Sequence, residues 1–250
     1  MKSLRTLVAK LGYEITSRKK SHLTLSDHLT KVLATHKIDN VIDVGANEGQ
    51  FAKQLRAGGY EGRIVSFEPI PHHAQKVAAY FSRDQNYSIH NCALGEAPGT
   101  LELNIYNDSV FSSFLQPSDR SHKYFGADVD LARKVQVPVQ RLDQVGGIVR
   151  PGEKVLLKMD TQGYDLRVFA GATSIIPSVQ AILVECSVIP LYEGAPNYID
   201  TLSVFFGQSF VPSGFFPISR DEGSLALIEF DCLMIRRQAA DPEHMKPLKG

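Results

Sequence analysis

The sequence predicts one α/β domain, in which a mostly parallel, seven-stranded sheet carries helices on both faces. From residue 41 onward, short apolar runs typical of buried strands alternate with segments of helical period. Such alternation indicates parallel strands joined by right-handed crossovers, which place helices on both faces of the sheet. The chain has 250 residues, 43% of them hydrophobic, which is enough to bury a single large core.

The segment before the sheet is predicted to be helical. Residues 2–16 keep basic residues off a stripe of apolar side chains at helical spacing: Leu4, Leu7, Val8, Leu11 and Ile15. We expect this amphipathic helix to pack on the domain or on a second subunit, which would make a homo-oligomer. The alternative is a basic helix that lies on a membrane surface. A second helix is expected from Leu25 to Thr35, with Ser26 or Thr24 as its N-cap.

Strands and helices then follow in turn. The strands of the main sheet are predicted at 41–45, 63–68, 87–94, 155–159, 181–184, 210–218 and 225–236. Helices are predicted at 48–57, 71–82, 164–171 and 197–207. The last two strands flank a turn at Asp221-Glu222-Gly223 and therefore form a hairpin. We accordingly divide the chain into a helical N-terminal extension (1–37), the α/β domain (38–237) and a polar C-terminal tail (238–250).

A further pair of strands interrupts this order. Residues 100–106 alternate between apolar and polar side chains, as a half-exposed strand does, and 135–142 looks like its partner. Between them, 107–134 is rich in Ser, Asp, His and aromatic residues and has no clear period. Loops of this length in compact domains are usually functional or mobile. We therefore predict that 107–134 is a lid over the substrate site.

The most informative stretch is the turn after the first strand of the sheet, Val44-Gly45-Ala46-Asn47-Glu48-Gly49. A dinucleotide fold needs Gly at the second position of G-x-G-x-x-G, so that the backbone can approach a diphosphate. Here Asn47 fills that position, and Glu48 adds a negative charge where a phosphate would lie. The pattern therefore favours a nucleotide site without a diphosphate. It disfavours an NAD-dependent oxidoreductase, the competing enzyme class.

The second strand ends in Glu68, at the place where folds of this kind use an acid to bind ribose hydroxyls. A nucleoside that lacks phosphate but carries amino and carboxylate groups is S-adenosylmethionine, which we predict as the cofactor. We expect Asp43 to bind its ammonium group and the backbone N–H groups from Ala46 to Glu48 to bind its carboxylate. Residues 92–94, with Ala93 at the centre, are expected to lie against adenine. The alternative is a structural strand–turn–helix without a ligand.

These motifs resemble the FkbM family of S-adenosylmethionine-dependent methyltransferases, over residues 38–237. The similar segments are Val41 to Gly49, Ser66 to Pro69, Ala93 to Gly95, Leu157 to Asp165, and Leu183 to Glu185. The resemblance implies a Rossmann-like class I methyltransferase fold with an antiparallel C-terminal strand. It also implies O-methylation of a hydroxyl on a sugar, a glycan or a secondary metabolite, and a hydrogen bond from Ser113 to cofactor or substrate. The chain departs from the family at Gln162, where the family usually carries Glu.

Three side chains are candidates for the chemistry at the acceptor. Asp160 ends strand 155–159 near the expected methyl group, where it could orient or deprotonate a hydroxyl. Glu185 ends the next strand, so the two carboxylates are expected to converge and could hold a divalent cation. Because hard cations usually take more oxygen ligands than two carboxylates offer, we expect no metal. His122 in the lid is the imidazole candidate for a base.

Composition narrows the partners and the compartment. Basic and acidic residues balance at 27 each, so no overall field draws the chain to nucleic acid. The three cysteines lie in apolar runs, and an odd number is a poor disulfide framework. Since no secretory signal is recognisable, we expect a cytoplasmic protein. A non-catalytic module that binds S-adenosylmethionine remains the alternative to an enzyme, because a fold alone does not decide function.

Overall fold

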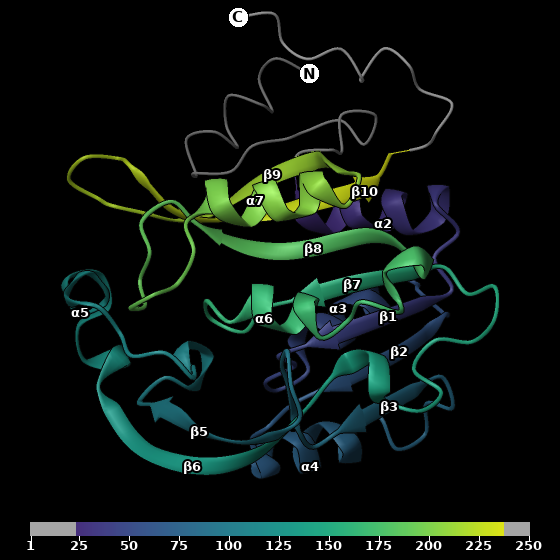
Figure 1. Cartoon of the computed structure of the whole chain (residues 1–250), viewed down its shortest axis with the longest axis horizontal. Helices are drawn as coiled ribbons and strands as arrows, with labels where there is room; N and C mark the ends of the chain where they lie inside the picture. Colours follow the sequence, from purple (N-terminus) through teal and green to yellow (C-terminus); the bar gives the residue numbers. More distant parts are fainter. Residues whose placement is uncertain (1–23, 238–250) are drawn as a thin grey trace, which may run out of the picture.

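The computed structural model describes residues 24–237 and contains the predicted seven-stranded sheet (Figure 1). Its order is β3 (Tyr87–His90), β2 (Arg63–Phe67), β1 (Asn40–Val44), β7 (Val155–Met159), β8 (Val179–Ser187), β10 (Leu227–Arg236) and β9 (Phe210–Arg220). The pairs formed among β1, β2, β3, β7 and β8 are all parallel. The last strand, β10, is antiparallel to both neighbours and lies between β8 and β9. The predicted antiparallel C-terminal strand is thereby confirmed.

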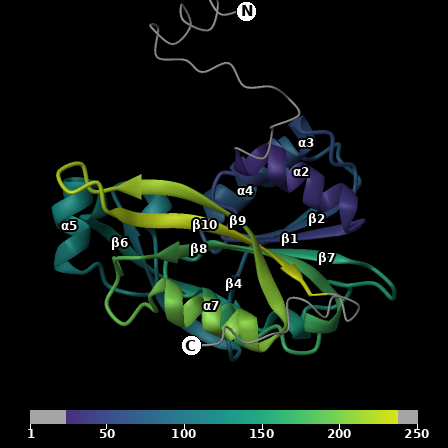
Figure 2. The same cartoon turned by 90° about the horizontal axis from the view of Figure 1, so that it is seen from above.

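Helices cover both faces of this sheet, as the alternating pattern predicted (Figure 2). One face carries α2 (Leu25–Thr35), α3 (Gln50–Ala57) and α4 (Pro71–Tyr80). The other face carries α6 (Asp165–Ala170) and α7 (Tyr198–Gly207). Odd and even positions of the buried strands supply the two cores, so that Val41 packs with the first group and Ile42 with the second.

The N-terminal helix α2 belongs to the domain's packing. Thr24 caps it by accepting a hydrogen bond from the backbone N–H of Asp27 at 3.2 Å, which confirms one of the two predicted caps. Leu29 and Leu33 are buried in the same core as Val41. The predicted boundary at residue 38 therefore does not coincide with a break in packing. The predicted helix at 2–16 lies outside the described residues.

The inserted strands form a second, three-stranded sheet. Its order is β4 (Ala93–Leu94), β6 (Leu131–Gln140) and β5 (Gly99–Tyr106), with β5 and β6 antiparallel. The single strand predicted over 87–94 is wrong in this respect, because β3 stays in the main sheet and β4 joins the small one. The chain changes sheet at Asn91, whose side-chain amide donates to the carbonyl oxygen of Glu68 at 2.8 Å.

The predicted lid has more regular structure than its sequence indicated. It contains a helix, α5 (Asp119–Phe125), and two short 3-10 turns, η2 (Ser109–Phe111) and η3 (Gly126–Val129). Two further 3-10 turns lie elsewhere, η4 (Leu142–Gln144) and η5 (Ile176–Ser178). Segments this short carry too few residues to show a helical period, which is why the sequence did not reveal them.

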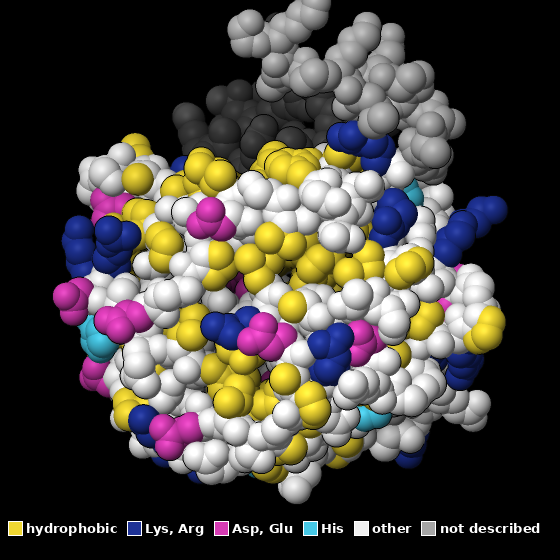
Figure 3. All heavy atoms as spheres, viewed as in Figure 1, with side chains coloured by type: hydrophobic (Ala, Val, Ile, Leu, Met, Phe, Trp, Pro, Cys, Tyr) yellow, Lys and Arg dark blue, Asp and Glu magenta, His cyan; other side chains and the backbone are white. Residues whose placement is uncertain are grey.

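Burial and surface charge agree with a globular domain. Cys92, Cys186 and Cys232 are buried and free, as expected. Charged side chains of both signs are interspersed over the face seen in Figure 3, in line with the balanced composition. Within residues 24–237, none of the helices has the length and apolar character needed to span a bilayer.

Candidate functional site

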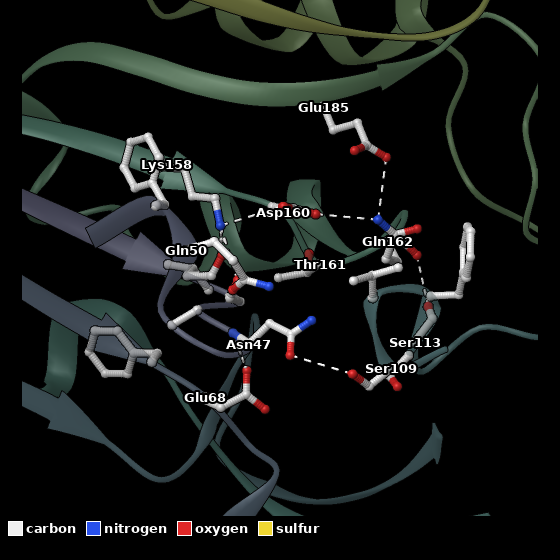
Figure 4. Close-up of a pocket in the computed structure, with 18 of the residues that line it drawn as sticks. Asn47, Gln50, Glu68, Ser109, Ser113, Lys158, Asp160, Thr161, Gln162 and Glu185 are labelled. Carbon is white, nitrogen blue, oxygen red and sulfur yellow. Dashed lines mark hydrogen bonds and ion pairs between the residues drawn. The ribbon is translucent and has the colours of Figure 1, made fainter. Parts of the chain in front are cut away.

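A cavity of about 480 Å³ opens at the carboxyl ends of β1, β2 and β7 (Figure 4). This is the edge at which open parallel sheets bind ligands, and the volume suits a nucleoside-sized molecule. The turn after β1 and the start of the lid line one side of it. Strands β9 and β10 of the hairpin line another, through residues such as Ser219 and Asp231.

The turn after β1 depends on glycine at its first position. Gly45 has a φ of +79°, and a Cβ added there would overlap the carbonyl oxygen of Asp160. The strand-end backbones of β1 and β7 therefore touch at this point. Asn47 also has a positive φ, of +46°, a conformation that Asn tolerates better than most residues. Its side chain points into the cavity, where its Oδ1 lies 3.5 Å from the hydroxyl of Ser109.

The backbone donors of this turn are already in use. The N–H of Ala46 donates to the carbonyl oxygen of Phe67 at 3.0 Å, and the N–H of Asn47 donates to Glu68 Oε2 at 2.7 Å. The expectation that these two groups receive the methionine carboxylate is therefore corrected, because each amide has a protein acceptor. Both residues nonetheless line the cavity.

Glu68 is held rigidly where the sequence placed it. Its side chain is 4% exposed, and its second oxygen accepts the backbone N–H of Ile70 at 2.8 Å. Burial raises the pKa of this carboxyl to about 7, although the two backbone donors act in the opposite direction. Each carboxylate oxygen can accept more than one hydrogen bond, so capacity remains for donors inside the cavity. This geometry fits a ribose that donates from two hydroxyls.

Asp43 does not line the cavity. It is fully buried, and its Oδ1 lies 2.9 Å from the ammonium group of Lys158. Lys158 itself lines the cavity and donates to the carbonyl oxygen of Gly45 at 3.0 Å. Burial acts to lower the pKa of Lys158, but the carboxylates of Asp43 and Asp160 raise it on balance, so the group stays charged. Of this pair, Lys158 lines the cavity and Asp43 does not, so the prediction that Asp43 binds the ammonium group of the cofactor is corrected.

The sequence pointed to Asp160 but not to the groups that hold it. Its side chain is 40% exposed, with Oδ2 at 3.5 Å from Lys158 Nζ and Oδ1 at 3.3 Å from the side-chain amide of Gln162. The same amide lies 3.4 Å from Glu185 Oε1. The structure therefore brings Asp160 and Glu185 to one place, as predicted. Lys158 belongs to the segment Leu157 to Asp165 that resembles the FkbM family, but the sequence pattern gave no reason to assign it a role in the site.

Two further carboxylates, Glu229 and Asp231 on β10, complete this end of the cavity. Asp231 is paired in register with Glu185 on β8. Burial, with help from neighbouring carboxylates, raises the pKa of Glu185 and Glu229, and it raises that of Asp231 to about 7. Sequence reasoning missed both β10 residues. The available signal was two acids at i and i+2 in an apolar strand, which places them on one face.

The opposite end of the cavity is largely apolar. Ala93 and Leu94 of β4 line it together with Phe114, and the contact of Ala93 with adenine stays a prediction. Ser113 also lines the cavity but is 1% exposed, and its hydroxyl donates to the carbonyl oxygen of Gln162 at 2.8 Å. Its visible role is to tie the lid to the turn after β7.

His122 is not brought to this site. It lies in α5, with a half-exposed side chain whose Nε2 is 3.7 Å from Asp130 Oδ1, and it is not part of the cavity wall. The interpretation of His122 as a base for the acceptor is corrected accordingly. Within the part of the chain that the structure describes, no three His, Cys, Asp or Glu side chains are arranged to hold a metal ion.

The donor set suits a cationic nucleoside better than a dinucleotide. Carboxylates outnumber cations around the cavity, the buried Glu68 faces the nucleoside side, and Asn47 fills the space that a diphosphate needs.

Comparison with known proteins agrees with this reading. A family model described as the methyltransferase FkbM domain matches residues 43–212. Methyltransferase sdnD of Sordaria araneosa is 25% identical over 247 residues, which cover 85% of this chain and 87% of sdnD.

Solved structures with a similar arrangement include an rRNA methylase from Streptococcus thermophilus, with a TM-score of 0.47 and 10% identity over 87% of this chain and 100% of that chain. An S-adenosylmethionine-dependent methyltransferase from Clostridium acetobutylicum has a TM-score of 0.45 and 7% identity, over 94% of this chain and 98% of that one. Because the family model spans well over half of its length, this chain belongs to the FkbM methyltransferase domain family and is a methyltransferase.

Proposed function

We propose that this protein transfers a methyl group from S-adenosylmethionine to a hydroxyl of a sugar, a glycan or a secondary metabolite. The observation that carries the cofactor assignment is Glu68, a buried carboxylate anchored by two backbone donors at the tip of β2. In the proposed complex, its remaining lone pairs accept the ribose hydroxyls. The adenine lies in the apolar end formed by Ala93, Leu94 and Phe114.

The charges at the strand ends support a role for Lys158 in holding the methionine end. Its ammonium group lines the cavity, where it can attract a carboxylate at close range. The acid-rich lining around Lys158 favours the sulfonium and ammonium charges of the cofactor. In the proposed complex, the methionine carboxylate therefore binds the side chain of Lys158 rather than the amides of the turn after β1.

The cofactor supplies a methyl carbon activated by a sulfonium, so the protein has to align the acceptor and exclude water. Asp160 is the side chain placed to do this, because it is partly exposed to the cavity and fixed by one donor on each oxygen. Its free lone pairs can accept the hydroxyl hydrogen and turn the oxygen toward the methyl group. A hydroxyl is a far weaker acid than a carboxyl, so the proton moves as the new bond forms.

A methyl-transfer assay tests this proposal. The full chain is incubated with S-adenosylmethionine labelled in the methyl group and with a panel of sugars, glycans and hydroxylated metabolites, alongside amine and thiol acceptors. Label on oxygen that disappears in Asp160→Asn supports the proposal. Label on nitrogen or sulfur, or an undiminished rate in Asp160→Asn, overturns the acceptor class or the role of Asp160 respectively.

A further inference from the structure

Gln162 lies in a turn whose backbone is unfavourable for its residue type. Its φ is +52°, in the left-handed region that residues other than Gly seldom adopt, and Gly163 follows with a φ of +88°. Such conformations persist where surrounding contacts hold them. Here the turn folds the side chain of Gln162 back toward Asp160 and Glu185 (Figure 4).

The amide nitrogen of Gln162 lies between two carboxyl groups. It is 3.3 Å from Asp160 Oδ1 and 3.4 Å from Glu185 Oε1. An amide nitrogen carries two hydrogens and accepts nothing, so it can donate one hydrogen to each acid. Gln162 therefore joins the acid at the end of β7 to the acid near the end of β8 without adding charge.

The direction of this amide is set by Tyr192. The hydroxyl of Tyr192 donates to Gln162 Oε1 at 2.9 Å and to the carbonyl oxygen of Phe111 at 2.7 Å, and its single hydrogen is shared between them. Tyr192 is 4% exposed, and burial raises the pKa of its phenol, so it remains a donor. With its oxygen turned to Tyr192, the amide presents its nitrogen to the two acids.

The backbone of Gln162 is held as well. Its carbonyl oxygen accepts the hydroxyl of Ser113 at 2.8 Å. Phe111 and Ser113 both belong to the first part of the lid, which lines the cavity. Gln162 therefore connects the lid to the carboxylates that face the acceptor.

The surroundings of this bridge are strongly acidic. Other charged or titratable groups around Asp160 and Glu185 are Lys158 on β7, Asp165 on α6, Cys186 on β8, Tyr192, and Glu229 and Asp231 on β10. Lys158 reaches Asp160 through Oδ2, on the side away from Gln162. In such surroundings a neutral donor stabilises negative charge on its neighbours, whereas a further carboxylate opposes it.

We propose that Gln162 is a positioning residue, whose amide donates to Asp160 and Glu185 together and fixes the Asp160 carboxylate toward the acceptor. The inference rests on the proposed function, in which Asp160 meets the acceptor hydroxyl.

A carboxyl titration tests this role without a known acceptor. Asp and Glu side chains are labelled with ¹³C, the signals of Asp160 and Glu185 are assigned with Asp160→Asn and Glu185→Gln, and their midpoints are followed against pH. Gln162→Leu should raise the midpoints of both groups by about one pH unit or more, because a donor to the charged form is lost. Tyr192→Phe should raise the two midpoints by less, because the hydroxyl of Tyr192 bonds Gln162 and Phe111 and acts on the acids only through Gln162.

The matched control is Gln116→Leu. Gln116 is an exposed lid residue whose amide donates to Asn104 Oδ1 at 3.3 Å, away from the acids, so both midpoints should stay unchanged. Circular dichroism establishes that each variant is folded. If Gln162→Leu does not fold, Tyr192→Phe carries the test.

The outcomes separate the two claims. Unchanged midpoints in folded Gln162→Leu, or in Tyr192→Phe if that variant alone folds, overturn the positioning role. Failure of the unaltered protein to bind S-adenosylhomocysteine by calorimetry instead overturns the proposed function, whatever the titration shows. With an acceptor identified, Gln162→Leu should lower kcat and leave the Kd for S-adenosylhomocysteine within about twofold of the original.

Discussion

The ammonium group of Lys158 lies 2.9 Å from Asp43 Oδ1 and also 3.5 Å from Asp160 Oδ2. One cation therefore serves a fully buried acid and an acid that lines the cavity. A buried charge without its partner is strongly destabilising, so this pair links the stability of the sheet to the charge pattern of the site. The link gives Asp43 a role in the fold although it does not line the cavity.

Replacement of Lys158 tests this link. Lys158→Met should lower the free energy of unfolding by about 3 to 5 kcal/mol, because Asp43 would remain buried without a counter-charge. Urea unfolding measures the change. The combined variant Asp43→Asn/Lys158→Met should recover part of the loss, since it removes both charges.

An exposed ion pair provides the comparison. Lys76 and Glu48 lie 2.6 Å apart with side chains about half exposed, so Lys76→Met should lower the free energy of unfolding much less than Lys158→Met does. Equal decreases in the free energy of unfolding for Lys158→Met and Lys76→Met would show that the buried ion pair contributes no more to stability than the exposed one.

The ribose contact is tested at Glu68. Glu68→Gln should weaken the binding of S-adenosylhomocysteine by roughly 10 to 100-fold, the effect of losing a hydrogen bond to a charged acceptor. Isothermal titration calorimetry gives the Kd. Glu48→Gln is the matched control, because Glu48 lies in the turn after β1, next to the Asn47 N–H that contacts Glu68, but its own side chain pairs with Lys76 at the surface. An unchanged Kd for S-adenosylhomocysteine in Glu68→Gln would contradict the assignment of Glu68 to the ribose.

The binding of the cofactor should depend on pH through the same residue. Burial raises the pKa of Glu68 from 4.5 to about 7, and a protonated carboxyl accepts hydroxyl hydrogens less well than a carboxylate. Affinity for S-adenosylhomocysteine should therefore fall as pH drops below about 7. The slope should flatten in Glu68→Gln, which separates Glu68 from Asp231, whose pKa is similarly raised to about 7.

The effect of Glu68 on stability has the opposite sign. Because its pKa is raised in the fold, the native state binds a proton more tightly than the unfolded chain. The contribution of Glu68 to stability is therefore greatest below pH 4.5 and is lost as pH rises to about 7. In Glu68→Gln this component of the pH dependence of unfolding should be absent.

The turn after β1 offers a test of close packing. Gly45→Ala forces a side chain into the left-handed region and against the carbonyl oxygen of Asp160. Gly59→Ala meets the same backbone penalty, with a φ of +84°, but no atom within 4 Å. Thermal and urea unfolding should show a loss of about 1 kcal/mol for Gly59→Ala and a clearly larger loss for Gly45→Ala. Equal losses would mean that backbone conformation alone, and not contact with Asp160, fixes Gly45.

Much of the fold was predictable because it depends on patterns that are local in the chain. Hydrophobic periodicity identified the alternating strands and helices. Turn residues between apolar segments identified the turn at Gly45 and the C-terminal hairpin. The break at Asn91 was not predicted, because only His90 and Asn91 separate the apolar residues on the two sides of the point where the chain changes from one sheet to the other. A choice of partner strand is made by tertiary packing and leaves no local signal.

The candidate site was predictable only in part, for a related reason. Glu68, Asp160 and Glu185 were found because each lies at or near the carboxyl end of a parallel strand, and such ends meet at one edge. Lys158 and Gln162 act through contacts across the turn, so their roles required the geometry. His122 was misplaced because composition marked the lid as functional without showing which of its residues face the cavity.

The most direct test of the whole account is a calorimetric titration of the full chain with S-adenosylhomocysteine and, separately, with NADH. We expect one molecule of S-adenosylhomocysteine to bind per chain, with an affinity that Glu68→Gln weakens and that excess NADH leaves unchanged. Saturable binding of NADH at the same place, with no response to S-adenosylhomocysteine, would contradict it.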